Sequence, residues 1–90
     1  MKTVPLIESS ALLKELRKGH IVAAYLNAEH YGDYEAYYNE LFGFSEGQIH
    51  KTVTLLGEIV NQPGHVVAVG KNGKVVSGVH TDIFDVEIDD

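Results

Sequence analysis

The chain has 90 residues, which is enough for one compact domain over residues 1–90 and too few for two. Apolar residues make up 44% and charged residues 22%, a balance typical of folded rather than disordered chains. Thirteen Asp and Glu against seven Lys and Arg give a formal charge of −6, and no cysteine is present. These features disfavour binding to nucleic acid or to an anionic membrane, and they exclude disulfides, thiolate metal sites and cysteine nucleophiles.

The first predicted elements are a short helix and a strand. Ser9 and Ser10 are N-cap candidates for a helix over residues 11–18, and Gly19 suits the left-handed residue that closes a helix. The stretch His20–Asn27 is apolar at even and odd positions, which indicates a strand buried on both faces. A short buried helix is the alternative for this stretch, and the fold would then be a small bundle capped by a three-stranded meander.

The next predicted element is a helix over residues 34–42. A turn and N-cap at Gly32 and Asp33 precede it, and Gly43 ends it. Its apolar side chains recur at helical spacing and form one stripe that we expect to pack in the core: Tyr34, Tyr37, Tyr38, Leu41 and Phe42.

A further helix is predicted immediately afterwards. Ser45 followed by Gln48 is a capping-box pattern, and Pro63 and Gly64 stop the helix after about 16 residues. Its predicted buried face consists of Ile49, Val53, Leu56 and Val60.

The valine-rich segment over residues 65–80 is predicted to form a β-hairpin. The Asn72-Gly73 pair at its centre is the strongest short-range hairpin signal, and a two-residue loop there sets the register of the two arms. The predicted facing pairs are Val69 with Val76, Val66 with Val79, and His65 with His80.

The chain ends in a predicted half-buried strand. Its inward positions are Phe84, Val86 and Ile88, and its outward positions are Asp85, Glu87 and Asp89. Such an acidic outer row discourages edge-to-edge pairing. The order of elements predicts an α+β fold of two layers, with about three helices packed on a small, mainly antiparallel sheet that ends in the Asn-Gly hairpin.

The negative charge lies in two blocks. Residues 19–50 carry five acids and no Lys or Arg, and residues 82–90 carry another five acids. Charge runs are typical of solvated faces that keep a small protein soluble. The sharper interpretation is that the blocks converge on one face that meets a basic partner, because complementary potentials speed encounter and exclude wrong partners.

This interpretation predicts a small acidic interaction module of the cytoplasm. It would inhibit or regulate a larger protein by occupying its basic, nucleic-acid-binding surface as a nucleic-acid mimic, as proteins of phages or other mobile elements do. Tyr31 lies outside the helical stripe, so its ring is expected to anchor the contact. The candidate partner-binding residues are Glu29, Tyr31, Asp33, Glu35, Glu40, Asp82, Asp85 and Glu87. No apolar segment long enough for a signal or a membrane span occurs in the sequence, so a membrane is not an expected partner.

The alternative function centres on His65 and His80. Residues facing each other across a ladder have Cβ atoms about 5 Å apart. Two imidazoles at that spacing can share a zinc or nickel ion, with Asp82 as an oxygen ligand. This end of the sheet would then serve a metal- or ligand-responsive domain or a small enzyme. Because a closed site needs four ligands, no metal or other cofactor is predicted.

Catalysis is not expected from the remaining patterns. No serine lies in a nucleophile elbow, and the glycine spacing does not fit a phosphate loop. A homodimer is a third alternative, because the apolar stripes of the two middle helices exceed what a small core covers.

Overall fold

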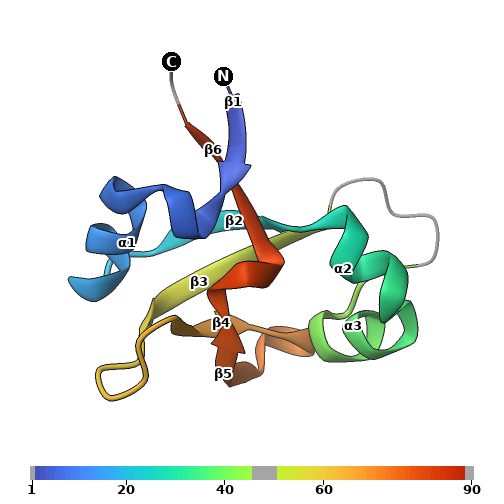
Figure 1. Ribbon diagram of the computed structural model, residues 1–90. Helices are drawn as coiled ribbons and strands as arrows, with labels where there is room; N and C mark the ends of the chain where they lie inside the picture. Colours follow the sequence, from blue (N-terminus) through green and yellow to red (C-terminus); the bar gives the residue numbers. More distant parts are fainter. Residues whose placement is uncertain (1, 46–50, 89–90) are drawn as a thin grey trace.

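The computed structural model describes residues 2–45 and 51–88 and shows one antiparallel sheet with helices around it (Figure 1). The sheet has six strands: β1 (Lys2–Pro5), β2 (Val22–Leu26), β3 (Thr52–Glu58), β4 (His65–Val69), β5 (Val75–His80) and β6 (Phe84–Ile88). The helices are α1 (Ser10–Arg17), α2 (Ala28–Asp33) and α3 (Glu35–Phe42), with 3-10 turns η1 (Leu6–Glu8), η2 (Lys71–Gly73) and η3 (Thr81–Ile83). The predicted α+β class with an antiparallel sheet is confirmed.

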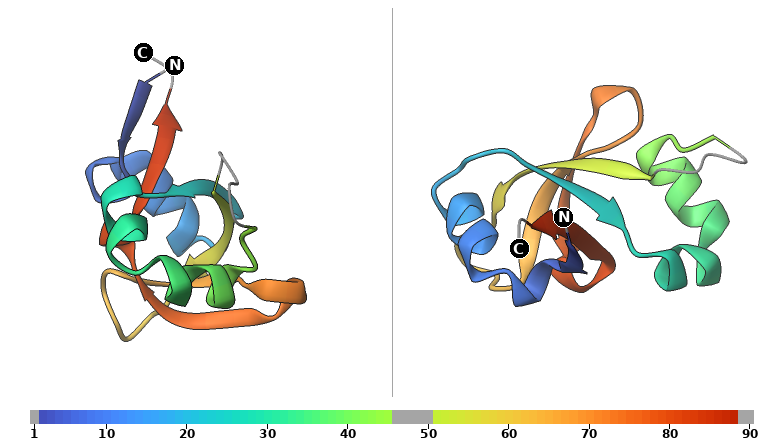
Figure 2. Two further views of the ribbon diagram at one scale, coloured as in Figure 1. Left: turned by 90° about the vertical axis from the view of Figure 1, so that its right-hand side faces the viewer. Right: turned by 90° about the horizontal axis from the view of Figure 1, so that it is seen from above.

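The strand order is β1-β6-β2-β3-β4-β5. Strands β2 to β5 form a meander, β6 returns to pair with β2, and β1 pairs with the other side of β6. Helix α1 lies at one end of the sheet, whereas α2 and α3 lie at the other end (Figures 1 and 2). The helices are therefore divided between two ends rather than collected together. In the described ranges, none of them combines the length and apolar content needed to cross a bilayer.

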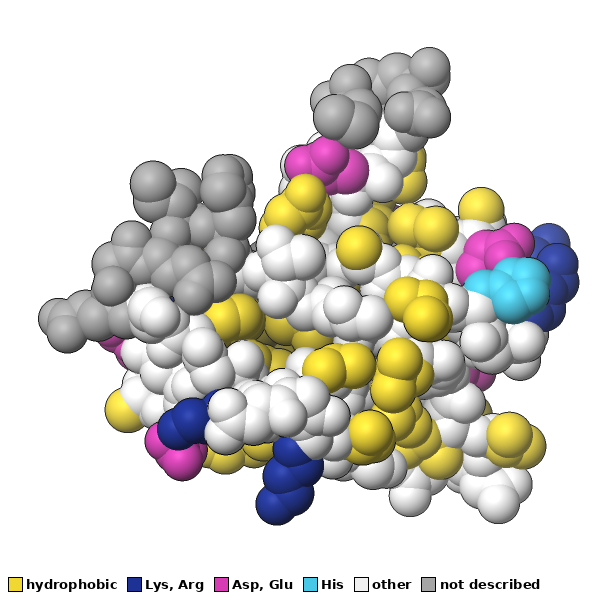
Figure 3. All heavy atoms as spheres, turned by 180° about the vertical axis from the view of Figure 1, so that it is seen from behind, with side chains coloured by type: hydrophobic (Ala, Val, Ile, Leu, Met, Phe, Trp, Pro, Cys, Tyr) yellow, Lys and Arg dark blue, Asp and Glu magenta, His cyan; other side chains and the backbone are white. Residues whose placement is uncertain are grey.

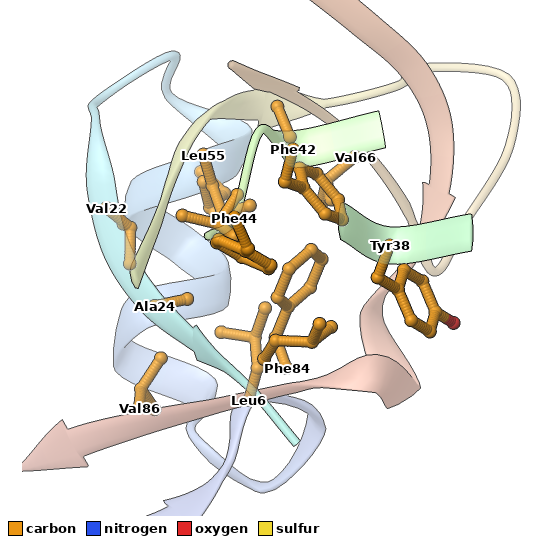
Figure 4. Close-up of a cluster of buried hydrophobic side chains, with 14 residues drawn as sticks. Leu6, Val22, Ala24, Tyr38, Phe42, Phe44, Leu55, Val66, Phe84 and Val86 are labelled. Carbon is orange, nitrogen blue, oxygen red and sulfur yellow. The ribbon is translucent and has the colours of Figure 1, made fainter. Parts of the chain in front are cut away.

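The core lies between the four inner strands, α1, η1 and α3 (Figure 4). Its buried apolar residues are Leu6, Leu16, Val22, Ala24, Leu26, Tyr38, Phe42, Phe44, Val53, Leu55, Val66, Ala68, Phe84 and Val86. Full burial of one such aliphatic or aromatic side chain contributes about 1.5–3 kcal/mol. The edge strands β1 and β5 contribute only partly buried side chains.

The first two predicted elements are confirmed as a helix and a strand. Gly19 follows α1 with a φ of +81°, as expected for a left-handed closing residue. In β2, Val22 and Ala24 are buried but the alternate residue Ala23 is exposed. The predicted burial of this strand on both faces is therefore wrong, because the core covers only one face of the sheet.

The predicted helix over residues 34–42 is confirmed as α3, and Gly43 ends it with a φ of +73°. Only part of its stripe is buried: Tyr38 is in the core, whereas Tyr34 and Tyr37 are 60% and 61% exposed. The predicted turn before it is wrong, because residues 28–33 form α2. Both helices pack at the end of the sheet, where nothing in the described chain covers their outer side.

The long helix predicted after Ser45 is wrong where the structure describes it, because residues 52–58 form β3. Val53 and Leu55 are buried, and Val60, which belonged to the predicted helical face, is 92% exposed. The burial therefore follows the strand period of two. Strands β2 and β4 pair with β3 on both sides, and this pairing outweighs the helical spacing. Gln48 and Ile49 lie outside the described residues.

The predicted hairpin forms from β4 and β5, but its loop is longer than expected. Asn72 and Gly73 in η2 have φ values of +59° and +77°. The Gly70 N–H donates to the Lys74 carbonyl, so three residues lie between this pair. The adjacent pairs are Val69–Val75 and Ala68–Val76, so the predicted pair Val69–Val76 is wrong.

Farther from the loop, the predicted register is restored. The pairing shifts by one residue between Val66 and Val67 of β4, beside Gly78 of β5, which has a φ of +84°. This bulge compensates for the extra loop residue. The predicted pairs Val66–Val79 and His65–His80 are therefore confirmed.

The final strand forms as predicted, but it is not at an edge. Phe84 and Val86 are fully buried, and β6 lies between β1 and β2. The acidic residues of β6 therefore do not prevent strand pairing at a sheet edge, which was the role predicted for them. The strand that covers it, β1, carries Lys2 and Pro5 and was not predicted.

We expect Gly70→Ala to destabilise the fold, because an added Cβ would lie 2.6 Å from Val76 Cγ2 and 2.7 Å from the Leu41 carbonyl oxygen. Overpacking of this kind costs about 1–3 kcal/mol, measured as the free energy of unfolding in urea. The matched control is Gly32→Ala in α2, where an added Cβ meets nothing within 4 Å. Equal stability of the two variants would contradict this packing of Gly70 between Leu41 of α3 and Val76 of β5.

Candidate functional site

The two acidic blocks meet at Asn27, between the end of β2 and the start of α2. The Asn27 side-chain amide donates to Asp85 Oδ2 at 3.1 Å, and its Oδ1 accepts from the Glu29 backbone N–H at 3.0 Å. The Asn27 backbone N–H donates to the Ile83 carbonyl at 2.7 Å. One residue thus caps α2 and holds the first part of β6 beside it.

Carboxylates extend from Asn27 along α2 and along β6. Glu29 and Asp33 are exposed and one helical turn apart on α2. Asp85 and Glu87 are alternate residues of β6 and therefore lie on the same side of that strand. We call these four residues, Glu29, Asp33, Asp85 and Glu87, the acidic junction. Within residues 2–45 and 51–88, none of the four forms an ion pair with Lys or Arg.

Tyr25 of β2 positions the carboxylate of Glu87. Tyr25 lies opposite Asp85 in the ladder between β2 and β6. Its hydroxyl donates a hydrogen bond to Glu87, and this bond together with the negative charge raises the pKa of Tyr25 above its ordinary value. Tyr25 and Glu87 therefore lie on the same face of the sheet, the face away from the core.

Three other predicted acids lie outside the acidic junction. Glu40 pairs with Lys71 Nζ at 3.6 Å, which offsets its charge. Asp82 lies in η3, where its carboxylate contacts the His80 imidazole. Glu35 is exposed in the first turn of α3.

Tyr31 lies against the core rather than standing free on the surface. Its hydroxyl donates to Asn39 Oδ1 at 2.7 Å, and its ring meets Phe44 edge-on at a centroid distance of 6.3 Å. Lys51 Nζ lies 4.3 Å from the ring centroid. The exposed rings of this region belong instead to Tyr34 and Tyr37.

His65 and His80 lie together at the far end of the hairpin. Their ring centroids are 4.8 Å apart and their planes are inclined by 76°. His65 Nδ1 lies 3.3 Å from the Pro63 carbonyl oxygen, and His80 Nδ1 faces Asp82. Among the residues that the structure describes, no cluster of three or more His, Asp or Glu is arranged to hold a metal ion. The contact is a ring pair at the surface.

Asn27 was not among the residues selected from the sequence. An Asn directly before a helical segment is an N-cap signal, but no helix was predicted before the turn at Gly32 and Asp33. The hydrogen bond from Asn27 to Asp85 joins residues that are 58 positions apart in the sequence, and no local pattern predicts such a contact.

Figure 3 shows the rear surface of the molecule. Apolar and uncharged side chains dominate this view, and carboxylates stand singly at its margins. No family model, curated protein or solved structure matches this chain. The geometry and charge of the surface therefore carry the functional argument.

The Tyr25–Glu87 contact predicts a change in alkaline titration. Because the pKa of Tyr25 is raised in the folded state, the contact stabilises the fold below the ordinary tyrosine value of 10.0. This stability is lost as pH rises through the raised value. We expect Glu87→Gln to return the pKa of Tyr25 toward 10.0, measured by ultraviolet absorbance of tyrosinate.

Tyr25→Phe should remove the same late step from the titration curve. Tyr38 is the internal control, because burial is the main cause that raises its pKa, and Glu87→Gln should leave it unchanged. An identical curve for Glu87→Gln and the unmodified protein would contradict the contact.

Proposed function

We propose that this protein is a small interaction module whose acidic junction binds a basic surface of a larger protein. The observation that carries the proposal is the side chain of Asn27, which bonds to Asp85 and to the backbone N–H of Glu29. This side chain thereby links the start of the helix that carries Glu29 to the strand that carries Asp85. A single basic surface can contact both.

The charge of the junction supports a cationic partner. Its four carboxylates have no Lys or Arg counter-ion within the described part of the chain, and the net charge is −6. Bringing like charges together is unfavourable, and a basic partner relieves this repulsion. Two cationic side chains are paired with other carboxylates: Arg17 with Glu58, and Lys71 with Glu40.

An aromatic ring stands beside the junction. Tyr34 follows Asp33 directly and is 60% exposed, with its ring edge-on to Tyr38 at a centroid distance of 6.3 Å. Tyrosine supplies a large contact area at low entropic cost and is frequent at binding hot spots. In this proposal Tyr34 takes the anchoring role that the sequence suggested for Tyr31.

The class of partner follows from this chemistry. Protein surfaces rich in Lys and Arg commonly hold phosphate groups of nucleic acids. A module that presents carboxylates beside an exposed tyrosine would compete with nucleic acid for such a surface. The module would act in the cytoplasm as an inhibitor or regulator, with the nucleic-acid machinery of a phage or another mobile element as one setting.

The test uses charge reversal at the exposed end of the junction. We expect Glu29→Lys and Asp33→Lys each to weaken binding of a labelled oligolysine peptide by about tenfold at low salt, equal to about 1.4 kcal/mol. Fluorescence anisotropy measures the affinity. Binding by the unmodified protein should fall as salt rises, because counter-ions screen exposed charges.

Glu15→Lys is the matched control, since it makes the same charge change in α1 at the opposite end of the sheet. A nucleic-acid-binding protein captured from host lysate should be released by added duplex DNA and lost with Glu29→Lys. Equal oligolysine affinity for all three variants would refute the acidic junction as the binding surface.

A further inference from the structure

Strand β5 is an open edge of the sheet. It pairs with β4 on one side, and no strand in the described residues pairs with its other side. Its six residues, Val75–His80, include no Asp, Glu, Lys, Arg or Pro. The opposite edge, β1, carries Lys2 and Pro5, which are residues that discourage further pairing. Of the two edges, β5 is the one without charged residues or proline, and its regular pairing runs from Val75 to Ser77, before the bulge at Gly78.

The backbone of β5 has free pairing groups on that edge. Gly70 and Lys74 are joined by a hydrogen bond of 2.6 Å across the hairpin, and hydrogen-bonded pairs alternate along an antiparallel ladder. Ala68 and Val76 therefore form the next hydrogen-bonded pair. It follows that the N–H and C=O groups of Ser77 point away from β4.

A groove runs beside this edge, between α3 and β5, and its lining combines apolar side chains with the charged residues Glu40, Lys71 and Lys74. One part has a volume of about 440 Å³ and extends from Tyr37 and Leu41 to Val76. A second part of about 230 Å³ shares these three residues and continues along β5 to His80. Val75, at the start of the strand, is 57% exposed. Apolar side chains of an added strand would have a surface to pack against.

The charges at the two ends of β5 are opposite. Lys74 directly precedes the strand, is exposed, and forms no ion pair within the described residues. Asp82 follows the strand by two positions and is also exposed. In an antiparallel pair of identical strands, the beginning of one lies beside the end of the other. Pairing about Ser77 would place Lys74 of each copy opposite His80 of the other, whose imidazole contacts Asp82, so the cationic start of one strand lies beside the acidic end of the other and the edge is self-complementary.

We propose that two copies of this chain pair through β5, antiparallel and about a two-fold axis near Ser77, to form one continuous sheet. The same surface serves both copies, as a two-fold interface requires. Main-chain hydrogen bonds at Ser77 and apolar packing in the two grooves provide affinity. The paired Lys74 and Asp82 side chains select the register and the antiparallel direction.

The proposal is independent of the acidic junction. In the sheet order, β6 is separated from β5 by β2, β3 and β4, so the paired edge and the acidic junction lie on different strands. The dimer would present two acidic surfaces to a partner. Linked sites of this kind increase overall avidity without any new contact.

Sedimentation equilibrium at low salt tests the dimer. We expect the unmodified protein to dimerise, and Lys74→Glu and Asp82→Lys each to weaken dimerisation by about tenfold or more, because two attractive contacts become repulsive. Mixing these two variants should restore a dimer, since each heterodimer contact again joins opposite charges. The double variant Lys74→Glu/Asp82→Lys should also dimerise.

Two further variants separate the edge from general charge effects. Lys14→Glu in α1 makes the same charge change as Lys74→Glu and should leave the dimer intact. Ser77→Pro removes an outward N–H and should reduce dimerisation while circular dichroism shows a folded chain. A protein that is monomeric at all concentrations overturns the proposal. So does a dimer whose stability is the same in all of these variants.

Discussion

The insertion of β6 between β1 and β2 is the interaction on which both the core and the candidate surface depend. Phe84 and Val86 point from this strand into the core and are fully buried. The intervening residue Asp85 points outward, and its carboxylate accepts a hydrogen bond of 3.1 Å from the side-chain amide of Asn27. Because side chains alternate along a strand, the same pairing that closes the core also places a carboxylate beside the start of α2.

This arrangement brings acidic groups from distant parts of the chain to one place. They gather where the end of β2, the start of α2 and β6 meet. The strand order places β6 in the interior of the sheet and leaves β5 at one edge. The charged surface and the uncharged edge thus lie on different strands. A binding function and self-association can coexist for that reason.

Local sequence patterns predicted α1, β2, α3 and the hairpin because each has nearby start or stop signals, such as Gly19 and Gly43. The helix predicted after Ser45 was wrong because the apolar residues Val53, Leu55 and Leu56 fit both the helical and the strand period. Pairing with β2 and β4 decided in favour of a strand. The contact between His65 and His80 was predicted correctly although the loop was not, since the bulge at Gly78 offsets the extra loop residue.

The amino-acid sequence alone determined the net charge, its concentration in two blocks, the lack of cysteine chemistry and the type of most elements, because these depend on composition or on neighbours a few residues apart. Only the tertiary structure decided that Asn27 joins the two blocks, that Tyr31 packs inward while Tyr34 is exposed, and that β5 is an open edge. Each of these results depends on which strands and helices become neighbours. That choice is made by hydrogen bonding and burial between segments far apart in the chain, which local periodicity does not encode.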